Sequence, residues 1–296
     1  MTELGREWIA GVPVDRVDME GAVGVVRGVL GGGGRCRILV VNANKAWLAR
    51  REARLRGVLA SAELVIAEWA MVWAAERLGR EGIGHVGGIT LMARLLAEAE
   101  REGWTVYLLG ARPEVVEKLA ERLRAERPAL RLVGWHHGYL DGESNARVRA
   151  ELARLRPDLL FVAMGSPLQE YWIDEGWGEL GARVALGVGG SFDVLAGLKR
   201  DAPDWARGRG LEWLYRLVQD PGRLWRRYLV TNTWFVWQVW RERLFGREVG
   251  VRPVAVVDTS AGTVGKANPV GAAAGEVREG RGRGGPGTGA AVMGDG

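Results

Sequence analysis

The sequence has very little that could cross-link the chain or bind a metal. It contains one cysteine, Cys36, among 296 residues. A single cysteine excludes an internal disulfide and a cysteine-rich metal site, and it fits a reducing compartment. The three histidines form no HxH or HExxH pattern, so a zinc site is not expected. An Asp-x-Asp motif for a metal–diphosphate complex is also missing. We therefore expect neither a metal nor a cofactor.

Signals for export and membrane insertion are missing too. The first residues, MTELGREWIAG, show no apolar core behind a basic start, so no signal peptide is predicted. A bilayer span needs about 18 apolar residues. The nearest candidate, Tyr228–Trp240, is shorter and contains four polar residues. The expected location is the cytoplasm.

What is present favours a large α/β domain. Apolar residues make up 47% of the chain, which is enough for a substantial core. The length suits one large α/β domain or two small ones. Almost all of the positive charge behind the net +5 is arginine. Because an arginine excess can reflect genome composition, the position of the charge says more about partners than its total.

Short apolar runs alternate with helical segments from residue 37 onwards. The runs are unbroken, as in parallel strands that are covered on both faces. Strands are expected at Arg37–Val41, Glu63–Ala67, Trp104–Leu109, Leu130–Val133, Leu159–Met164 and Arg183–Val188. Helices are expected at Met19–Leu30, Lys45–Ala60, Ile89–Glu102 and Pro113–Arg127, with loops at Gly31–Gly34 and His136–Tyr139. The alternation predicts an α/β fold, a Rossmann-like parallel sheet with helices on both faces.

The stretch Asp158–Lys199 is the centre of the predicted site. Its first strand ends at Gly165 and its second at Gly187-Val188-Gly189-Gly190. Ligands of open α/β sheets bind beyond the carboxyl ends of the strands. The polar residues expected near one ligand, with help from an earlier strand end, are Gln169, Glu170, Ser191 and Asp193.

Three of these features have a plain structural alternative. Glu68 ends a strand beside a tryptophan and could act as a general base, or it could favour the start of a helix through the helix dipole. The loop from Gly187 to Ser191 could hold phosphate with its backbone amides, or form an ordinary tight turn. Gln169 could bond a sugar or phosphate, or cap the helix that follows it.

The composition changes after Lys199. The segment Lys199–Arg247 contains eleven Lys or Arg, five Asp or Glu and six tryptophans, and two or three helices broken near Pro221 are expected. This mixture suits a membrane interface, a nucleic-acid surface or an ordinary packed helical end. After about Glu248 the chain is rich in Gly, Pro, Ala and Arg and is expected to be disordered. The predicted domains are therefore residues 1–198, 199–247 and 248–296.

Several strings together resemble the WecG/TagA/CpsF glycosyltransferases, over about residues 8–245: LLGARPEVVEKLAERL, HHGY, GSPLQEYWI, GVGGSFDVLAG and the segment KRDAPDWARGRGLEWLYRLVQDPGRLWRRYL. The resemblance implies a Rossmann-like, metal-independent and often oligomeric enzyme. Such enzymes move an N-acetylhexosamine, often N-acetylmannosamine, from a UDP-sugar to a lipid-diphosphate-linked sugar. The resemblance also implies work on the cytoplasmic leaflet, in teichoic acid, common antigen or capsule assembly, and a C-terminal appendage that helps bind the membrane.

The resemblance also implies roles for single residues. Gln169 matches an active-site glutamine, and Asp193 matches a nucleotide-binding aspartate. Tyr139 matches a tyrosine near the diphosphate, and Asn44 the asparagine after the first strand. The other substrate-binding candidates are Asn42, Gly110, Gly187, Gly189, Gly190, Ser191 and the appendage arginines Arg216, Arg223, Arg226 and Arg227.

This chain departs from the family pattern at its strand ends. Where the family has Thr-x-Asn and a Pro-Asp-Gly with the catalytic aspartate, this chain has Asn42-Ala43-Asn44 and Ala67-Glu68-Trp69. His85 stands where the family has an arginine, and Leu168 where it has a lysine. The changes cluster on the sugar and acceptor side, whereas the nucleotide loop is preserved. We therefore expect a UDP-sugar enzyme with an unusual sugar or acceptor.

The predicted mechanism gives Glu68 the role of base toward the acceptor hydroxyl. Gln169 and Asn44 would hold the sugar, and His85 would act as a donor in place of the arginine. Amides around Gly189 and the appendage arginines would stabilise the leaving UDP. The expected partners are a UDP-sugar, a polyprenyl-diphosphate-linked sugar, the inner face of the cell membrane and further copies of the chain, but no nucleic acid. The alternatives are a non-catalytic sugar-nucleotide or lipid-binding protein and a nicotinamide-dependent oxidoreductase, which would need a GxGxxG after the first strand.

Overall fold

A computed structural model describes residues 4–203, 206, 212–219 and 221–246, without the side chains at positions 216, 223, 224 and 227. The expected disordered tail, residues 248–296, lies outside this part of the chain. The described residues belong to one compact unit. The division into three domains remains a prediction.

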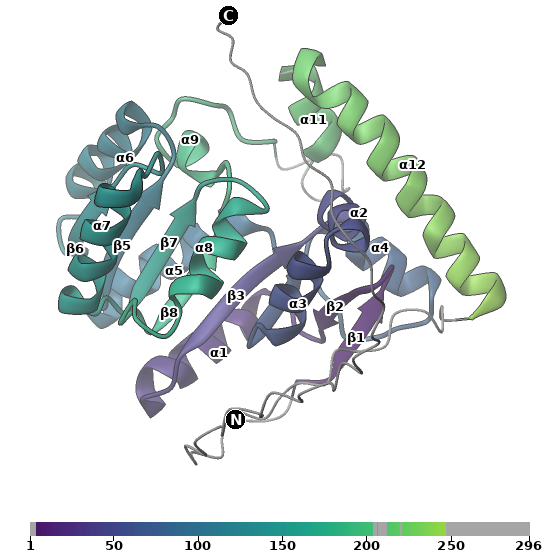
Figure 1. The fold of residues 1–296 in the computed structure, drawn as a ribbon, viewed down its shortest axis with the longest axis horizontal. Helices are drawn as coiled ribbons and strands as arrows, with labels where there is room; N and C mark the ends of the chain where they lie inside the picture. The colour runs from purple at the N-terminus through teal and green to yellow at the C-terminus, as the bar shows by residue number, and fades with distance from the viewer. Residues whose placement is uncertain (1–3, 204–205, 207–211, 220, 247–296) are drawn as a thin grey trace, which may run out of the picture. The chain divides into compact units, whose positions relative to one another are not determined.

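A six-stranded parallel sheet organises the structure, in the order β4-β3-β8-β7-β5-β6 (Figure 1). Its strands are β3 (Cys36–Val41), β4 (Leu64–Ala67), β5 (Thr105–Gly110), β6 (Arg131–His136), β7 (Leu159–Ala163) and β8 (Val184–Gly187). The last strand of the described residues, β8, therefore lies between β3 and β7. A separate antiparallel hairpin is formed by β1 (Arg6–Ile9) and β2 (Val12–Asp15). The predicted α/β parallel sheet is confirmed.

Helices cover both faces of the sheet (Figure 1). They are α1 (Met19–Gly32), α2 (Ala43–Arg51), α3 (Ala53–Ser61), α4 (Trp69–Arg77), α5 (Gly88–Glu102), α6 (Pro113–Glu126), α7 (Gly142–Leu155), α8 (Leu168–Gly176), α9 (Ser191–Leu195), α11 (Glu212–Gln219) and α12 (Pro221–Phe245). The break between α11 and α12 falls near Pro221, as expected from the sequence. None of the helices in the described part of the chain combines the length and apolar character that crossing a bilayer requires.

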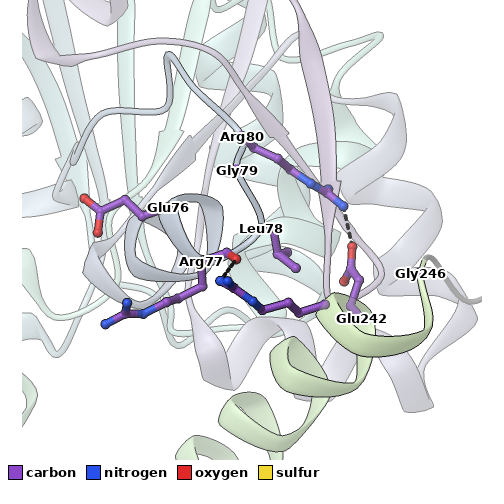
Figure 2. A pocket seen from close by; sticks show the side chains of 8 residues that line it. Glu76, Arg77, Leu78, Gly79, Arg80, Glu242 and Gly246 are labelled. Carbon is purple, nitrogen blue, oxygen red and sulfur yellow. Dashed lines mark hydrogen bonds and ion pairs between the residues drawn. The ribbon is translucent and has the colours of Figure 1, made fainter.

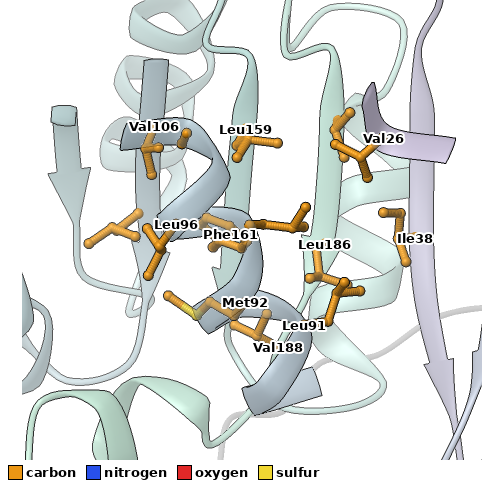
Figure 3. Close-up of a cluster of buried hydrophobic side chains, with 14 of the residues drawn as sticks. Val26, Ile38, Leu91, Met92, Leu96, Val106, Leu159, Phe161, Leu186 and Val188 are labelled. Atoms are coloured by element: carbon orange, nitrogen blue, oxygen red, sulfur yellow. The ribbon is translucent and has the colours of Figure 1, made fainter. Parts of the chain in front are cut away.

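Alternate residues of each strand enter different cores, because successive strand side chains point to opposite faces. Ile38 and Phe161 face the core under α1, α5 and α6, where Val26, Leu91 and Met92 meet them (Figure 3). Leu39 and its neighbour Val41 face the opposite way, into a cluster with α2, α3 and α4. Both faces of the sheet are therefore buried, which explains the unbroken apolar runs in the sequence.

The long helix α12 packs on the same side of the sheet as α2 and α4. Phe235 and Val239 are buried in the cluster that contains Leu39 and Val41. At its far end Glu242 accepts a hydrogen bond from the Ala10 amide at 3.1 Å and pairs with Arg80 at 2.5 Å. The helix is thus tied to the hairpin and to the segment after α4.

Three local predictions need correction. The expected helix Lys45–Ala60 is two helices, because Glu52 adopts an extended backbone between α2 and α3 while its carboxylate accepts a bond from Tyr171 at 2.5 Å. Gly31 and Gly32 are helical, since α1 ends at the left-handed Gly33. His136 is the last residue of β6 and does not begin the loop.

Candidate active site

The polar residues predicted from the strand ends lie along one edge of the sheet. Parallel strands place their carboxyl ends together, and the open edge beyond them is where ligands of such sheets bind. Asn42 follows β3, Glu68 follows β4, and Gly187 ends β8 between them and β7. The expected meeting of these segments at one edge is therefore found.

Glu68 and Asn42 form a pair across the first two strand ends. The Asn42 side chain donates a hydrogen bond from Nδ2 to Glu68 Oε2 at 3.0 Å. Its Oδ1 accepts a hydrogen bond from the Lys45 amide, so Asn42 is the N-cap of α2. Glu68 is half-buried at the N-cap position of α4, but its side chain makes no capping bond there. The carboxylate therefore sits where the helix dipole favours its charge, with its orientation set by Asn42.

His85 lies directly beside this pair. Its ring stacks on Trp69, with ring centroids 4.4 Å apart and an interplanar angle of 17°. Burial lowers the pKa of His85 below its usual 6.5, and the charge of Glu68 opposes this shift only in part. At neutral pH the imidazole therefore favours its uncharged form and does not supply the positive charge of the arginine that the resemblance implies at this position.

The first turn of α11 approaches the same histidine. Glu212 Oε1 lies 3.9 Å from His85 Nε2, and the two side chains are equally exposed at 20%. Glu212 belongs to the GLEWLYR string on which the family resemblance depends. The helices after residue 199 thus reach the edge of the sheet at its β4 end.

Gln169 is buried and engaged at both ends of its amide. Its Oε1 accepts the Gly189 amide at 3.0 Å, and its Nε2 donates to Glu170 Oε1 at 2.8 Å. It makes no capping bond at the start of α8, so the helix-cap alternative does not hold. Gln169 instead connects the end of β7 to the loop after β8.

The glycine-rich loop after β8 makes a tight turn into α9. Gly189 has a φ of +53°, which favours glycine. The Ser191 hydroxyl donates to the Val188 carbonyl at 2.7 Å, and Ser191 is buried. Asp193 lies in the first turn of α9 and pairs with Lys199 at 3.2 Å. The loop therefore forms a tight turn, and phosphate binding by its backbone amides stays a prediction.

Gly110 and Tyr139 mark the far side of the sheet edge. A Cβ on Gly110 would lie 2.5 Å from the Ala163 backbone, so only glycine lets β5 and β7 meet here. Tyr139 follows β6, and its side chain is 69% exposed. The structure therefore does not bring Tyr139 into the cluster around Glu68 and Gln169.

The remaining sequence candidates are placed less fully. Asn44 is half-buried in the first turn of α2. Arg226 is exposed on α12 and lies over the Trp225 ring at 5.2 Å. The side chains of Arg216, Arg223 and Arg227 lie outside the described residues.

Sequence reasoning missed three residues at this edge: Lys45, Trp69 and Glu212. Lys45 forms a buried ion pair with Glu170, at 2.7 Å between Nζ and Oε1. The only feature of the sequence that could have pointed to Lys45 was its place in the first turn of the helix after the first strand. Trp69 was noted only as a neighbour of Glu68, although its ring stacks against the ring of His85. Within the described ranges no three His, Cys, Asp or Glu side chains gather as metal ligands would.

An open cleft of about 490 Å³ lies elsewhere, at the far end of α4 (Figure 2). Arg80 and Glu242 meet on one side, and Arg243 donates to the Arg77 carbonyl on another (Figure 2). The nine-residue helix α4 separates this cleft from Glu68, and a helix of that length spans about 13 Å. The cleft thus belongs to the packing of α12 and lies apart from the strand ends.

Comparison with known proteins decides the family. The model of the Glycosyl transferase WecG/TagA/CpsF family matches residues 7–249. The chain belongs to this family. The family's match includes α11 and α12, so these helices are part of the shared architecture.

Curated relatives of this WecG/TagA/CpsF protein carry a common name, N-acetylglucosaminyldiphosphoundecaprenol N-acetyl-beta-D-mannosaminyltransferase. The protein of Bacillus spizizenii is 32% identical over 193 residues, which are 65% of this chain and 74% of the relative. That of Bacillus subtilis is 31% identical over the same length. The protein of Staphylococcus aureus is 32% identical over 221 residues, 74% of this chain and 86% of the relative. The recognition of the family from the sequence is confirmed, and this protein is a glycosyltransferase.

The lowered pKa of the half-buried His85 generates a prediction about pH and stability. Because its pKa is lower in the folded protein, the unfolded chain binds the proton more readily, and stability falls as pH drops from above 6.5 through the folded-state pKa. We expect the melting temperature to fall between about pH 7.5 and 5.5, and to fall less in His85→Gln. Thermal denaturation of both proteins across this range measures the difference. An equal fall in both would show that His85 is not buried as described.

Proposed function

We propose that this chain transfers an N-acetylhexosamine, with N-acetylmannosamine as the first candidate, from a UDP-sugar to a sugar on a polyprenyl diphosphate. The family membership and the names of the relatives support the lipid-linked acceptor. The proposal includes a metal-independent reaction and action at the inner membrane surface, in cell-surface polymer assembly. Its single most important structural support is the Asn42–Glu68 pair at the strand ends.

The chemistry follows from the free oxygen of that pair. Asn42 holds Glu68 Oε2, which leaves Oε1 to take a proton. The acceptor hydroxyl attacks the anomeric carbon of the donor sugar, its proton passes to Glu68, and the bond to UDP breaks with its electron pair on the diphosphate. Attack from the face opposite UDP inverts the anomeric centre. Glu68 thus serves in place of the family's aspartate on a side chain one methylene longer.

The leaving diphosphate needs positive charge and hydrogen-bond donors. The turn around Gly190 and the appendage arginines are the groups proposed for this role. Gly189 is less suited to it, because its amide already donates to Gln169. His85 is assigned no charge in this scheme, since its pKa is lowered. It shapes the acceptor side through its stack on Trp69.

Substitution of Glu68 by glutamine tests the proposed base. The glutamine oxygen can still accept from Asn42, so the fold and UDP binding are expected to remain, whereas kcat falls by about 10²–10⁴-fold. Release of UDP in the presence of acceptor measures kcat, and calorimetry measures the Kd for UDP. Glu76→Gln, on the exposed end of the same helix, is the matched control.

Two outcomes would contradict the assignment. Transfer at the wild-type rate by Glu68→Gln would remove Glu68 as the base. UDP binding by the wild-type protein without any UDP release would instead favour a non-catalytic sugar-nucleotide-binding protein. The uncharged His85 in place of an arginine is the observation that keeps this second function in view.

The outer face of α12 supports the proposed membrane contact. Thr231 and Phe235 are buried, and the side chains on the opposite face are exposed. Those exposed residues are Trp225, Arg226, Leu229, Val236, Trp237, Trp240 and Leu244. Tryptophan and leucine mixed with arginine suit the interface of an anionic membrane. We call these residues the outer face of α12.

Removal of two tryptophans from this face tests the contact. Trp237→Ala combined with Trp240→Ala is expected to weaken binding to vesicles of anionic phospholipid at least about tenfold, because apolar area is lost from the interface. Sedimentation with vesicles measures the binding. Leu168→Ala, which removes an exposed apolar side chain outside α12, is the control. Unchanged binding of the double variant would exclude this face.

A further inference from the structure

A buried ion pair bridges the carboxyl end of the central strand β8. Lys45 comes from α2, which follows β3, and Glu170 comes from α8, which follows β7. Since β8 lies between β3 and β7, the two side chains approach its end from opposite sides. Their Nζ and Oε1 atoms are 2.7 Å apart, and both residues are at most 4% exposed. A charged pair in this position is shielded from solvent and has few alternative partners.

The ion pair determines how Gln169 is oriented. A carboxylate can only accept hydrogen bonds and a backbone N–H can only donate them. Gln169 lies between Glu170 Oε1 and the Gly189 amide, at 2.8 and 3.0 Å. Only one orientation of its side-chain amide satisfies both neighbours, with the NH₂ toward Glu170 and the oxygen toward Gly189. The carboxylate thus selects the orientation that holds the loop.

Gly187 makes room for this arrangement. A Cβ at Gly187 would lie 2.7 Å from Gln169 Nε2. The last residue of β8 must therefore be glycine for Gln169 to reach across the strand end. The glycine-rich loop, the glutamine and the ion pair form one packed unit.

We propose that Glu170, whose buried charge is balanced by Lys45, is a positioning residue that fixes the glycine-rich loop through Gln169, so that the turn at Gly189 and Gly190 is already formed when a nucleotide diphosphate binds. This inference rests on the proposed function for the identity of the ligand. It changes the role of Gln169 from a sugar-binding residue to the connector between the ion pair and the loop. A preformed turn reduces the entropy lost on binding.

Substitutions can distinguish the effect of the two charges of the ion pair from the effect of the hydrogen-bond acceptor at position 170. Glu170 Oε2 has no hydrogen-bond partner in the described structure, so the buried carboxylate depends on Lys45 for its charge balance. Removing Lys45 alone would leave a buried charge and destabilise the fold. Two double variants avoid this: Lys45→Met/Glu170→Met removes both charges and the acceptor, whereas Lys45→Met/Glu170→Gln removes both charges and keeps an acceptor for Gln169.

Hydrogen–deuterium exchange of the loop is the decisive measurement, because it needs no ligand. We expect the peptide that covers residues 186–192 to exchange at least about tenfold faster in Lys45→Met/Glu170→Met than in the wild type. Lys45→Met/Glu170→Gln is expected to stay close to the wild type. Arg54→Met/Glu175→Gln, which removes an exposed ion pair between α3 and α8, is the control that changes neither loop exchange nor UDP binding.

UDP binding provides the second readout. At temperatures where all variants are folded, Lys45→Met/Glu170→Met is expected to bind UDP about tenfold more weakly, in parallel with its faster exchange. Equal loop exchange in the two double variants would overturn the inference, whatever their melting temperatures. Failure of the wild type to bind UDP would instead contradict the proposed function and leave the exchange result to judge the positioning role.

Discussion

The insertion of β8 between β3 and β7 is the constraint on which the site depends. Among the strands that the structure describes, this one comes last in sequence, yet it occupies a central place in the sheet. Its ladder bonds to both neighbours bring the loop at Gly187–Ser191 beside Asn42 on one side and Gln169 on the other. Segments more than a hundred residues apart thus meet at one edge, and the buried Lys45–Glu170 pair bridges them over the strand end.

Three departures from the expected family pattern, at Asn42, Glu68 and His85, fall on the β3–β4 side of this edge, whereas Leu168 lies at the start of α8. Glu68 retains a carboxylate, and Asn42 supplies the hydrogen bond that orients it. His85 does not supply the charge of the arginine that the resemblance implies here, because its half-buried ring stacks on Trp69 and its pKa is lowered. The opposite side, with Gln169 and the glycine-rich loop, is a tightly packed unit.

Much of the fold could be predicted from the sequence, because both faces of the sheet are buried and its strands are unbroken apolar runs. The strand ends also located Glu68, Asn42 and the glycine-rich loop. Pairings between distant polar residues could not be predicted, since neither Lys45 nor Glu170 shows in its local sequence that the other lies beside it. The expected place of Tyr139 near the diphosphate stays a prediction, because its side chain is exposed and no contact in the structure fixes it beside Glu68 or Gln169.

Direct transfer from UDP-N-acetylmannosamine tests the central claim most plainly. The wild-type protein would be incubated with this donor and a short-chain polyprenyl-diphosphate-N-acetylglucosamine in the presence of EDTA. Mass spectrometry would then measure the mass of the lipid product. The account predicts a product heavier by one N-acetylhexosamine, with one UDP released for each transfer. Absence of transfer from this and other UDP-N-acetylhexosamines, or transfer that requires added divalent metal, would contradict it.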